Sequence, residues 1–428
     1  MTKAPRIDWI LMLAVLGLVT LGSLLVWSAT THRDDLTGGD PTAYLKKQLV
    51  NVAIGLVLMA IVLATDHRWV RIVAPFVYLG SVVGLVLVLT MGSTVNGSRS
   101  WLMLGGMSIQ PSEFAKLAVV IGMALWVAER ADVRRGRPGG SAGDVIGMLA
   151  IAGLPTVLIL LQPDLGTMLV LSATVFGVLA VSGAPRRWLA LLAGLPAVLI
   201  LLQPDLGTML VLSATVFGVV AASGAPRRWL VLLLGGAVTA AVAAVSAGLL
   251  EQYQVDRFLA FTNPDLDPRG AGYNVEQARI AVGNGGLFGQ GLFDGSQTRA
   301  GFVPEQHTDF VFTVAGEELG LLGAGVLIAL LGLVIWRALA IAARTDDVFG
   351  RLAAAGIACW FGFQAFQNVG MCLGIMPVTG VPLPFVSYGG SSMFAGMLAI
   401  GLLQNIHLRS NAVLPARYTM PTRVLVRA

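Results

Sequence analysis

Long apolar runs separated by shorter polar segments make up most of this chain. Twelve runs approach the roughly 20 residues that a helix needs to cross a bilayer. They cover residues 8–28, 49–65, 69–91, 112–128, 144–161, 165–183, 188–202, 206–224, 229–249, 311–336, 352–375 and 386–407. Ten-residue segments of alternating polarity, which indicate a transmembrane β-barrel, are not seen in the sequence. The pattern predicts an all-α fold: a polytopic membrane helical bundle of about twelve helices, forming a single membrane domain over residues 1–428.

The amino-acid composition supports a membrane protein. Of the 428 residues, 56% are hydrophobic and 12% are charged, whereas a soluble domain carries about 25% charged residues. The mean hydropathy is +0.79. Cys359 and Cys372 both fall within apolar runs, so no disulfide framework is predicted.

The placement of Lys and Arg predicts the orientation of the chain. With the N-terminus inside, the cytoplasmic loops and tails hold most of the 28 basic residues, including those of a basic tail at 408–428. Both termini are then cytoplasmic, and the long polar segment at 251–310 is a large extracytoplasmic loop. The net charge of +5 follows from this topology and implies no nucleic-acid partner.

A tandem duplication interrupts the middle of the chain. Residues 153–193 and 194–234 are identical at 36 of 41 aligned positions. Each unit reads as a helical hairpin in which Pro-Asp begins a helix, with Asp164 or Asp205 available as its N-cap. One added unit adds two crossings, so the orientation of everything that follows is kept.

Asp309 is the first candidate for chemistry, because it closes the polar segment where the apolar sequence resumes. A carboxylate at a partly desolvated border can have a raised pKa, which suits a general base near neutral pH. His307 lies two residues earlier and could orient a substrate or tune Asp309. The structural alternatives are an N-cap role for Asp309, in a helix starting at Phe310, and a packing role for His307.

Further charged residues occur within or beside the apolar runs. Glu113 and Lys116 are three apart, so they share one helix face and can pair. Charges inside membrane segments are functional hypotheses by default, and the alternative is a structural ion pair near the outer interface. Glu317 and Glu318 are expected about two turns beyond Asp309 on one helix, where they line a cavity or are buried and hydrogen-bonded.

Several outward residues suit anion binding, because the planar guanidinium of arginine donates two parallel hydrogen bonds to a diphosphate. These candidates are Arg99, Arg257, Arg269, Arg279 and Arg299. The glycines of 283–291 follow no strand and predict a bent stretch of backbone rather than a nucleotide loop. No second histidine or cysteine lies at metal-ligand spacing from His307, which argues against a zinc site built by the protein.

The outward motifs, taken in order, resemble one family, the SEDS proteins (shape, elongation, division and sporulation), and within it the RodA branch. The matching stretches are Asn96–Leu102, Gln110–Lys116, the Gln-Pro-Asp-Leu-Gly-Thr motif, Asp265–Tyr273, the glycine-rich stretch 283–291, Pro304–Phe310 and Gly380–Ser392. SEDS proteins have ten membrane helices, so the duplicated hairpin accounts for the two extra runs. Only one of Asp164 and Asp205 can take the family's position.

The resemblance implies an activity. SEDS proteins are peptidoglycan glycosyltransferases that polymerise lipid II outside the bacterial cytoplasmic membrane, release undecaprenyl pyrophosphate and work with a class B penicillin-binding protein. Asp309 matches the proposed catalytic aspartate, the motifs also cover Glu113 and Lys116, and Arg257 and Arg279 match basic positions. No organic cofactor is implied, and a divalent cation held by the lipid pyrophosphate stays open. Two rival readings are a lipid II flippase and a non-catalytic scaffold for the penicillin-binding protein.

Overall fold

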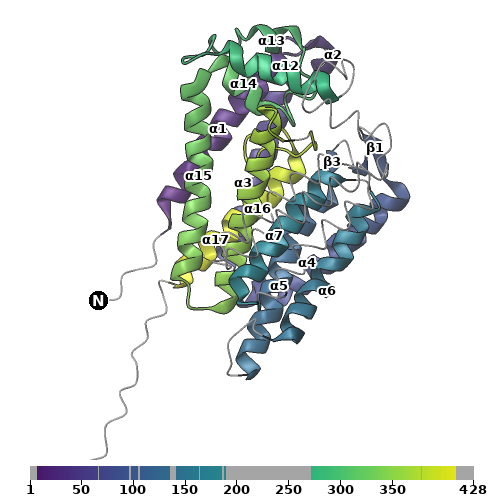
Figure 1. Ribbon diagram of the computed structural model, residues 1–428, viewed down its shortest axis with the longest axis vertical. Coiled ribbons are helices and arrows are strands. Elements are labelled where there is room, and N and C mark those ends of the chain that lie inside the picture. The colour runs from purple at the N-terminus through teal and green to yellow at the C-terminus, as the bar shows by residue number, and fades with distance from the viewer. Residues whose placement is uncertain are drawn as a thin grey trace, which may run out of the picture.

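Helices form most of the part of the protein that the structure describes. The computed structural model describes residues 7–188, 271–376 and 378–410, apart from residues 66, 96–97, 105–106, 135–140, 163 and 186–187. The helices are α1 (Trp9–Thr31), α2 (Asp34–Thr37), α3 (Ala43–Ala64), α4 (His67–Met91), α5 (Pro111–Arg134), α6 (Ala142–Leu160), α7 (Leu165–Ser182), α12 (Ala271–Asn284), α13 (Ser296–Ala300), α14 (Val311–Glu318), α15 (Gly320–Arg344), α16 (Val348–Cys372) and α17 (Gly390–Ser410). The long helices run side by side, and the short helices α2, α12, α13 and α14 gather at one end (Figure 1).

The described helices confirm a polytopic helical membrane protein. Eight of them (α1, α3, α4, α5, α6, α15, α16 and α17) are long and apolar enough to cross a membrane, and α7 contributes a shorter apolar helix at Gly166–Ser182. The predicted runs at 188–202, 206–224 and 229–249, and the second repeat unit at 194–234, lie outside the described residues.

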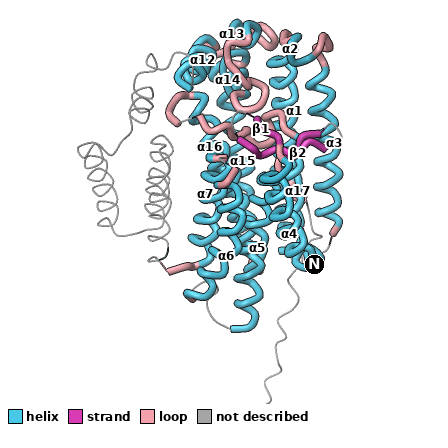
Figure 2. The backbone as a smooth tube through the Cα atoms, turned by 90° about the vertical axis from the view of Figure 1, so that its right-hand side faces the viewer, coloured by secondary structure: helices cyan, strands magenta, loops and turns pink. Residues whose placement is uncertain are grey.

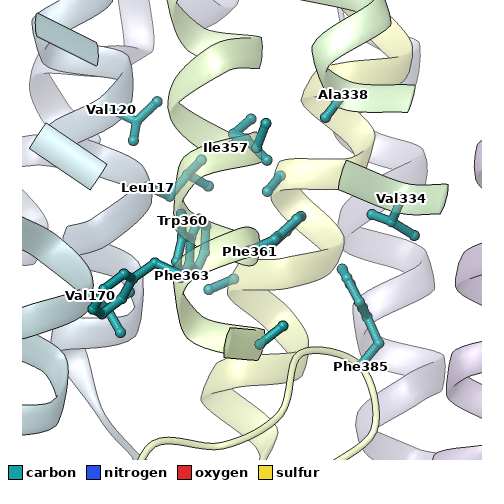
Figure 3. Close-up of a cluster of buried hydrophobic side chains, with 14 of the residues drawn as sticks. Leu117, Val120, Val170, Val334, Ala338, Ile357, Trp360, Phe361, Phe363 and Phe385 are labelled. Atoms are coloured by element: carbon teal, nitrogen blue, oxygen red, sulfur yellow. The ribbon is translucent and has the colours of Figure 1, made fainter. Parts of the chain in front are cut away.

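Helix α16 is the centre of the bundle, packed against α5, α7 and α15. Figure 3 shows its side chains meeting those of all three helices, and the buried residues there include Leu117, Val120, Val170, Val334, Ile357, Trp360 and Phe361. Because lipid tails are as apolar as these side chains, close packing holds membrane helices together. Gly356 shows how close it is: a Cβ there would lie 2.7 Å from both Val120 and Val178.

A small antiparallel sheet joins α4 to α5, which the prediction of an all-helical fold did not include. Its strands β1 (Ser93–Val95), β2 (Ser98–Leu104) and β3 (Met107–Ile109) pair in the order β1-β2-β3. The register sets Thr94 opposite Arg99 and Leu102 opposite Ile109. The strands lie toward the end of the bundle that carries α12 and α13 (Figure 2).

The prediction of one helix across 311–336 was wrong, because the chain breaks between α14 and α15. Gly320 has a φ of 66°, which is left-handed and favours glycine. The turn after α12 fills the break: the N–H groups of Leu321 and Leu322 donate to the carbonyls of Gly286 and Leu287 at 2.9 and 3.1 Å. Donors that would be orphaned at a helix start are thereby satisfied.

The described part of the predicted loop, from residue 271 onward, is folded against the bundle. Gly286, Gly289 and Gly291 have φ values of 54°, 83° and 102°, so the bent glycine-rich stretch predicted at 283–291 is confirmed. Its N–H groups at Gln290 and Gly291 donate to the last carbonyls of α14, at 3.0 and 3.1 Å. This end of the protein therefore has a fixed shape, and Asp309 lies within it.

Candidate functional site

A tight turn holds Asp309 immediately before α14. The N–H groups of Thr308, Asp309 and Phe310 converge on the carbonyl oxygen of Glu305, at 3.2, 2.9 and 3.2 Å. Glu305 itself has a φ of 48°, which is unusual for a residue other than glycine. The N-cap of α14 is Phe310, and no side chain caps the helix. The N-cap alternative for Asp309 is therefore wrong, because its carboxylate does not cap α14.

The surroundings of the Asp309 carboxylate change its acidity. The residue keeps partial exposure, but protein atoms enclose it closely. This burial, together with the negative charges of Glu305 and Asp164, raises the pKa of Asp309 to about 7. A carboxyl group with that pKa can both accept and release a proton near neutral pH, as a general base must.

A segment without regular secondary structure, residues 378–389, lies beside the carboxylate. Gly380, with a φ of 66°, is so close that a Cβ on it would lie 3.4 Å from Oδ2 of Asp309. Asn368 of α16 binds both the Asp309 turn and this segment, because its Nδ2 donates to the carbonyls of Asp309 and Val381, each at 2.7 Å.

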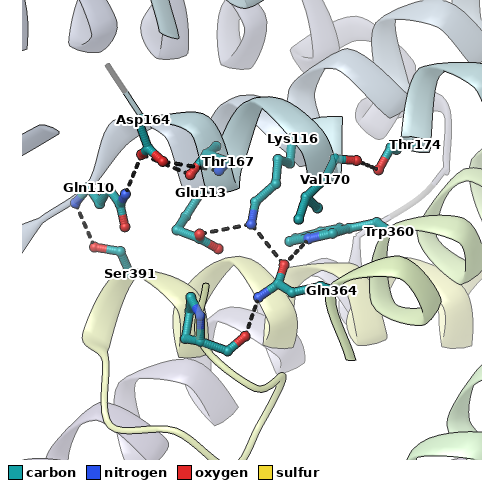
Figure 4. Close-up of polar contacts among 11 residues, drawn as sticks. Gln110, Glu113, Lys116, Asp164, Thr167, Val170, Thr174, Trp360, Gln364 and Ser391 are labelled. Atoms are coloured by element: carbon teal, nitrogen blue, oxygen red, sulfur yellow. Dashed lines mark hydrogen bonds and ion pairs between the residues drawn. The ribbon is translucent and has the colours of Figure 1, made fainter. Parts of the chain in front are cut away.

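The first repeat unit supplies the next carboxylate. Asp164 is the N-cap of α7, as predicted, and it accepts from the N–H of Thr167 at 3.0 Å and from its hydroxyl at 2.8 Å. Gln110 donates to the same carboxylate at 3.0 Å (Figure 4). A Cβ on Gly166 would collide with the carbonyl oxygen of Thr379, so α7 begins directly against the segment beside Asp309.

Glu113 and Lys116 form the predicted pair, at 2.8 Å. Both side chains are buried, with exposures of 2% and 0%, between α5 and α16. The Lys116 ammonium also donates to Oε1 of Gln364 at 2.8 Å and lies 5.1 Å above the Trp360 ring (Figure 4). Gln364 in turn donates to the carbonyl of Pro382 at 2.8 Å. The ion pair therefore supports the segment that lines the carboxylate.

Comparison with known proteins identifies the family. The family model described as "Cell cycle protein" (FtsW/RodA/SpoVE) matches residues 8–195 and 186–412. The chain belongs to this family. The two matched parts overlap at residues 186–195, and the first repeat unit ends within this overlap, at residue 193. The predicted resemblance to the SEDS family is thus confirmed over nearly the whole chain.

Relatives and solved structures agree with this assignment. The chain is 34% identical to "Peptidoglycan glycosyltransferase MrdB" of Escherichia coli over 94% of each protein. It is also 34% identical to "Probable peptidoglycan glycosyltransferase FtsW" of Halothiobacillus neapolitanus over 98% of this chain and 91% of the relative. The solved structure of the rod shape determining protein RodA of Thermus thermophilus matches with a TM-score of 0.59 and 29% identity, covering 94% of this chain and 97% of that one. A structure described as "Structural coordination of polymerization and crosslinking by a peptidoglycan synthase complex" matches with a TM-score of 0.69 and 29% identity over 95% and 98%.

His307, the second candidate in the family motif at 304–310, is buried against aromatic rings. Its ring packs edge-on against Tyr44 of α3, with ring centroids 4.9 Å apart, and 5.8 Å from Tyr388. Its carbonyl accepts from the N–H of Tyr388 at 3.0 Å. Burial lowers the pKa of His307, which favours a neutral imidazole. These contacts fit the packing alternative, because they hold the turn against α3 and against the segment at 378–389.

The three candidate arginines that the structure describes each contact other groups of the protein. Arg99 of β2 donates to the carbonyls of Gly92 and Thr90 at 2.9 and 3.0 Å, so it satisfies the end of α4. Arg279 of α12 is exposed, lies 3.7 Å from Glu276, and rests its aliphatic stem against Gly374, just beyond α16. Arg299 lies 3.4 Å from Asp294 on the surface. Arg257, Arg269 and Asp205 fall outside the described residues.

Glu317 and Glu318 are buried and hydrogen-bonded, which was the structural alternative to lining a cavity. Glu317 accepts from the N–H groups of Gln297 and Thr298 at 2.6 and 3.0 Å, at the start of α13. Glu318 accepts from the Ser28 hydroxyl of α1 at 2.6 Å. Both lie in α14, ahead of the membrane-spanning helix α15, because of the break at Gly320. They join this end of the bundle together.

Sequence reasoning missed three residues that shape the site: Glu305, Asn368 and Gly380. Glu305 lies inside the motif that drew attention to Asp309, and its carbonyl organises the whole turn. Asn368 is a polar residue in an apolar run, which is itself a signal. Among the described residues, no group of three or more His, Cys, Asp or Glu side chains could hold a metal ion.

Proposed function

We propose that this chain is a peptidoglycan glycosyltransferase that polymerises glycan strands from lipid II, with Asp309 as the general base. The observation that carries the proposal is a partly exposed carboxylate that stabilises no helix end, whose pKa is raised to about 7. It occurs in a chain whose family relatives are named peptidoglycan glycosyltransferases.

The proposed reaction is an inverting displacement. The hydroxyl oxygen of the acceptor sugar attacks the anomeric carbon of the donor, and its proton passes to the Asp309 carboxylate. The bond between that carbon and the donor's diphosphate oxygen breaks, and undecaprenyl pyrophosphate leaves. The donor is already activated, so the protein supplies positioning and one base. Arginines of the outer segment would bind the diphosphate, with Arg257 and Arg279 as candidates, and Glu113 and Lys116 would keep the floor of the site in shape.

The location follows from the same proposal. The basic residues of the loops and tails favour cytoplasmic termini, so the end that carries Asp309 would face outward from the bacterial cytoplasmic membrane. Lipid II presents its sugars on that side. A class B penicillin-binding protein would be the partner, and a related structure is described as a peptidoglycan synthase complex. The activity would serve cell elongation and shape.

A polymerisation assay tests the base. Purified chain with its partner is incubated with labelled lipid II, and glycan polymers are separated on a gel. Wild-type protein should form polymer and Asp309→Asn should form none, because an amide cannot accept the proton. The matched control is Asp294→Asn, since Asp294 is an exposed carboxylate of the same polar segment. Equal polymer from wild type and Asp309→Asn would contradict the assignment.

Two further experiments test the rival functions. A flippase would move labelled lipid II across vesicle membranes without forming polymer. A scaffold would support cell-wall growth in cells that carry Asp309→Asn, because it needs only the surface that docks the partner.

A further inference from the structure

We propose that Asn368 is the positioning residue of the catalytic carboxylate, acting through the main chain of Asp309. Asn368 does not belong to the motifs that suggested the site, and it lies on α16, remote in sequence from the turn it contacts. The inference rests on the proposed function, because it assigns a role in the reaction that Asp309 would catalyse.

The geometry of the Asn368 amide defines this role. Asn368 is fully buried, and its Nδ2 uses both hydrogens, one on the carbonyl of Asp309 and one on the carbonyl of Val381, each at 2.7 Å. Both neighbours are acceptors only, so the orientation of the amide is fixed. The two carbonyls belong to the two backbone segments that meet at the carboxylate. Asn368 therefore sets the distance between the turn at 305–310 and the segment at 378–389.

The Asp309 residue is thereby held on both sides. Its N–H donates to the carbonyl of Glu305 at 2.9 Å, and its carbonyl accepts from Asn368. With both main-chain groups fixed, the direction of the Cα–Cβ bond is fixed too. Gly380, also anchored through its neighbour Val381, limits where the carboxylate can swing.

Asn368 is one member of a row of amides on α16. Gln364, Gln367 and Asn368 are spaced i, i+3 and i+4, which places them on one helix face. Gln364 donates to the carbonyl of Pro382 at 2.8 Å, and Gln367 donates to the hydroxyl of Thr379 at 3.1 Å. The row therefore fixes three points of the segment over residues 379–382, and Asn368 alone extends the hold to Asp309.

The Oδ1 atom of Asn368 supports a role that depends on the donors. This oxygen is buried and has no hydrogen-bond partner within the described part of the chain. An unpartnered buried acceptor costs about 1–3 kcal/mol. If Asn368 served stability alone, a side chain without this unpaired oxygen would be better. The cost is explained if the position needs two N–H donors that reach the carbonyls of Asp309 and Val381 together. Ionised aspartate cannot donate, and serine donates only once.

Asn405 of α17 provides a matched control. It too is buried, and its Nδ2 bridges two carbonyls, those of Val62 and Thr65, at 2.8 and 2.6 Å. The N-terminal end of α17, at Gly390, faces the Asp309 turn. Asn405 lies 15 residues beyond Gly390, which is about 22 Å along the helix. Removal of its amide breaks the same kind of two-carbonyl bridge far from the site, together with a hydrogen bond that its Oδ1 accepts from Arg409 at 2.9 Å.

The test compares Asn368→Ala, Asn368→Asp and Asn405→Ala, each purified with the partner and assayed with labelled lipid II. A displacement of about 1 Å can lower the rate about 100-fold. We expect kcat to fall by about that factor in both Asn368 variants, with KM changed by less than about threefold. The acid limb of the kcat profile against pH should also move. Asn405→Ala should keep the wild-type kcat and pH profile, although both alanine variants lower the thermal unfolding temperature.

Three results would overturn the proposal. One is an equal loss of kcat in Asn368→Ala and Asn405→Ala, which would show a general packing effect. Another is a rise in KM with kcat unchanged, which would make Asn368 a substrate ligand. The third is wild-type kcat in Asn368→Asp. If Asn368→Ala does not fold, Asn368→Ser keeps one donor and should show an intermediate kcat. Absence of polymer from the wild-type protein would instead contradict the proposed function.

Discussion

The duplicated units offer an internal experiment, because Asp164 and Asp205 occupy identical Gln-Pro-Asp-Leu-Gly-Thr motifs. The structure places the first of them beside Gln110 and close enough to Asp309 for its charge to raise the pKa of that carboxyl. We predict that Asp164→Ala and Asp164→Asn impair the protein and that the same changes at Asp205 do not.

The size of the effect follows from the contacts that Asp164 makes. Loss of an aspartate N-cap costs about 0.5–2 kcal/mol, and loss of the hydrogen bond from Gln110 to a charged group costs about 1.5–3 kcal/mol. Asp164→Ala should therefore destabilise the start of α7 by about 2–5 kcal/mol. The helix cannot shift to compensate, because Gly166 already touches the segment at 379–381.

Asp164→Asn tests the electrostatic part separately. It keeps an oxygen for the cap but removes one of the negative charges that raise the pKa of Asp309. The pKa of Asp309 should then fall, so the base stays deprotonated to lower pH. The acid limb of kcat should move toward lower pH in Asp164→Asn and stay in place in Asp205→Asn.

The expectation for Asp205 rests on how the first unit is anchored. The part of α6 that precedes the first unit, before residue 153, has no counterpart ahead of the second unit. Two contacts hold this part of α6: Tyr78 donates to the carbonyl of Ile151 at 2.7 Å, and Arg130 lies 3.2 Å from Asp144. Leu179 of α7 is fully buried, and the second unit has the smaller Val220 at that place. That exchange alone would cost about 1 kcal/mol.

The assays are thermal unfolding in detergent and polymer formation against pH, with all four variants made in the full chain. Deletion of either whole unit is less informative, since the two deletions leave chains that differ at only five positions. Equal losses from the Asp164 and Asp205 variants would refute the reasoning, because they would show that both copies can serve the site.

Two further predictions concern the base and the ion pair. Because burial and neighbouring charges raise the pKa of Asp309 to about 7, kcat should fall as the pH drops through about 7 and the base is protonated; a profile flat between pH 5 and 8 would contradict this. Lys116→Met leaves Glu113 buried and unpaired, so it should lower stability by about 3–5 kcal/mol. The double variant Glu113→Leu/Lys116→Met should recover most of that loss in denaturant unfolding, and a double variant as unstable as the single one would count against the isolated-charge explanation.

The long helices were predictable because each is an apolar run that lipid or protein must enclose. Runs at 8–28, 69–91, 112–128 and 352–375 match α1, α4, α5 and α16 closely. The break between α14 and α15 was not predicted, because Glu317 and Glu318 were expected to lie further along one continuous helix. Its cause is non-local: the turn after α12 supplies carbonyls to Leu321 and Leu322. The sheet at 93–109 was missed, and two of its three strands have only three residues.

The site was only partly predictable for a related physical reason. Position relative to a polar border singled out Asp309, and helical spacing paired Glu113 with Lys116, because both signals are local. Which partners surround Asp309 depends on how distant segments pack, so neither Asn368 nor Gly380 could be assigned to it. The polar row Gln364, Gln367 and Asn368 lies in an apolar run and on one helix face, but it was not used to predict the site.

That row explains why a membrane bundle keeps buried amides and an ion pair at its centre. Backbone that leaves the helix within a membrane protein loses its own hydrogen bonds, so neighbouring protein must satisfy it. The segment at 378–389 is such backbone, and Gln364 and Asn368 supply donors to the carbonyls of Pro382 and Val381. Lys116, bonded to Gln364, fixes the orientation of that amide. The Asp309 carboxylate thus lies beside backbone that is not helical. The polar side chains of α16 near it are needed, before any role in the reaction, to satisfy the carbonyls of that backbone.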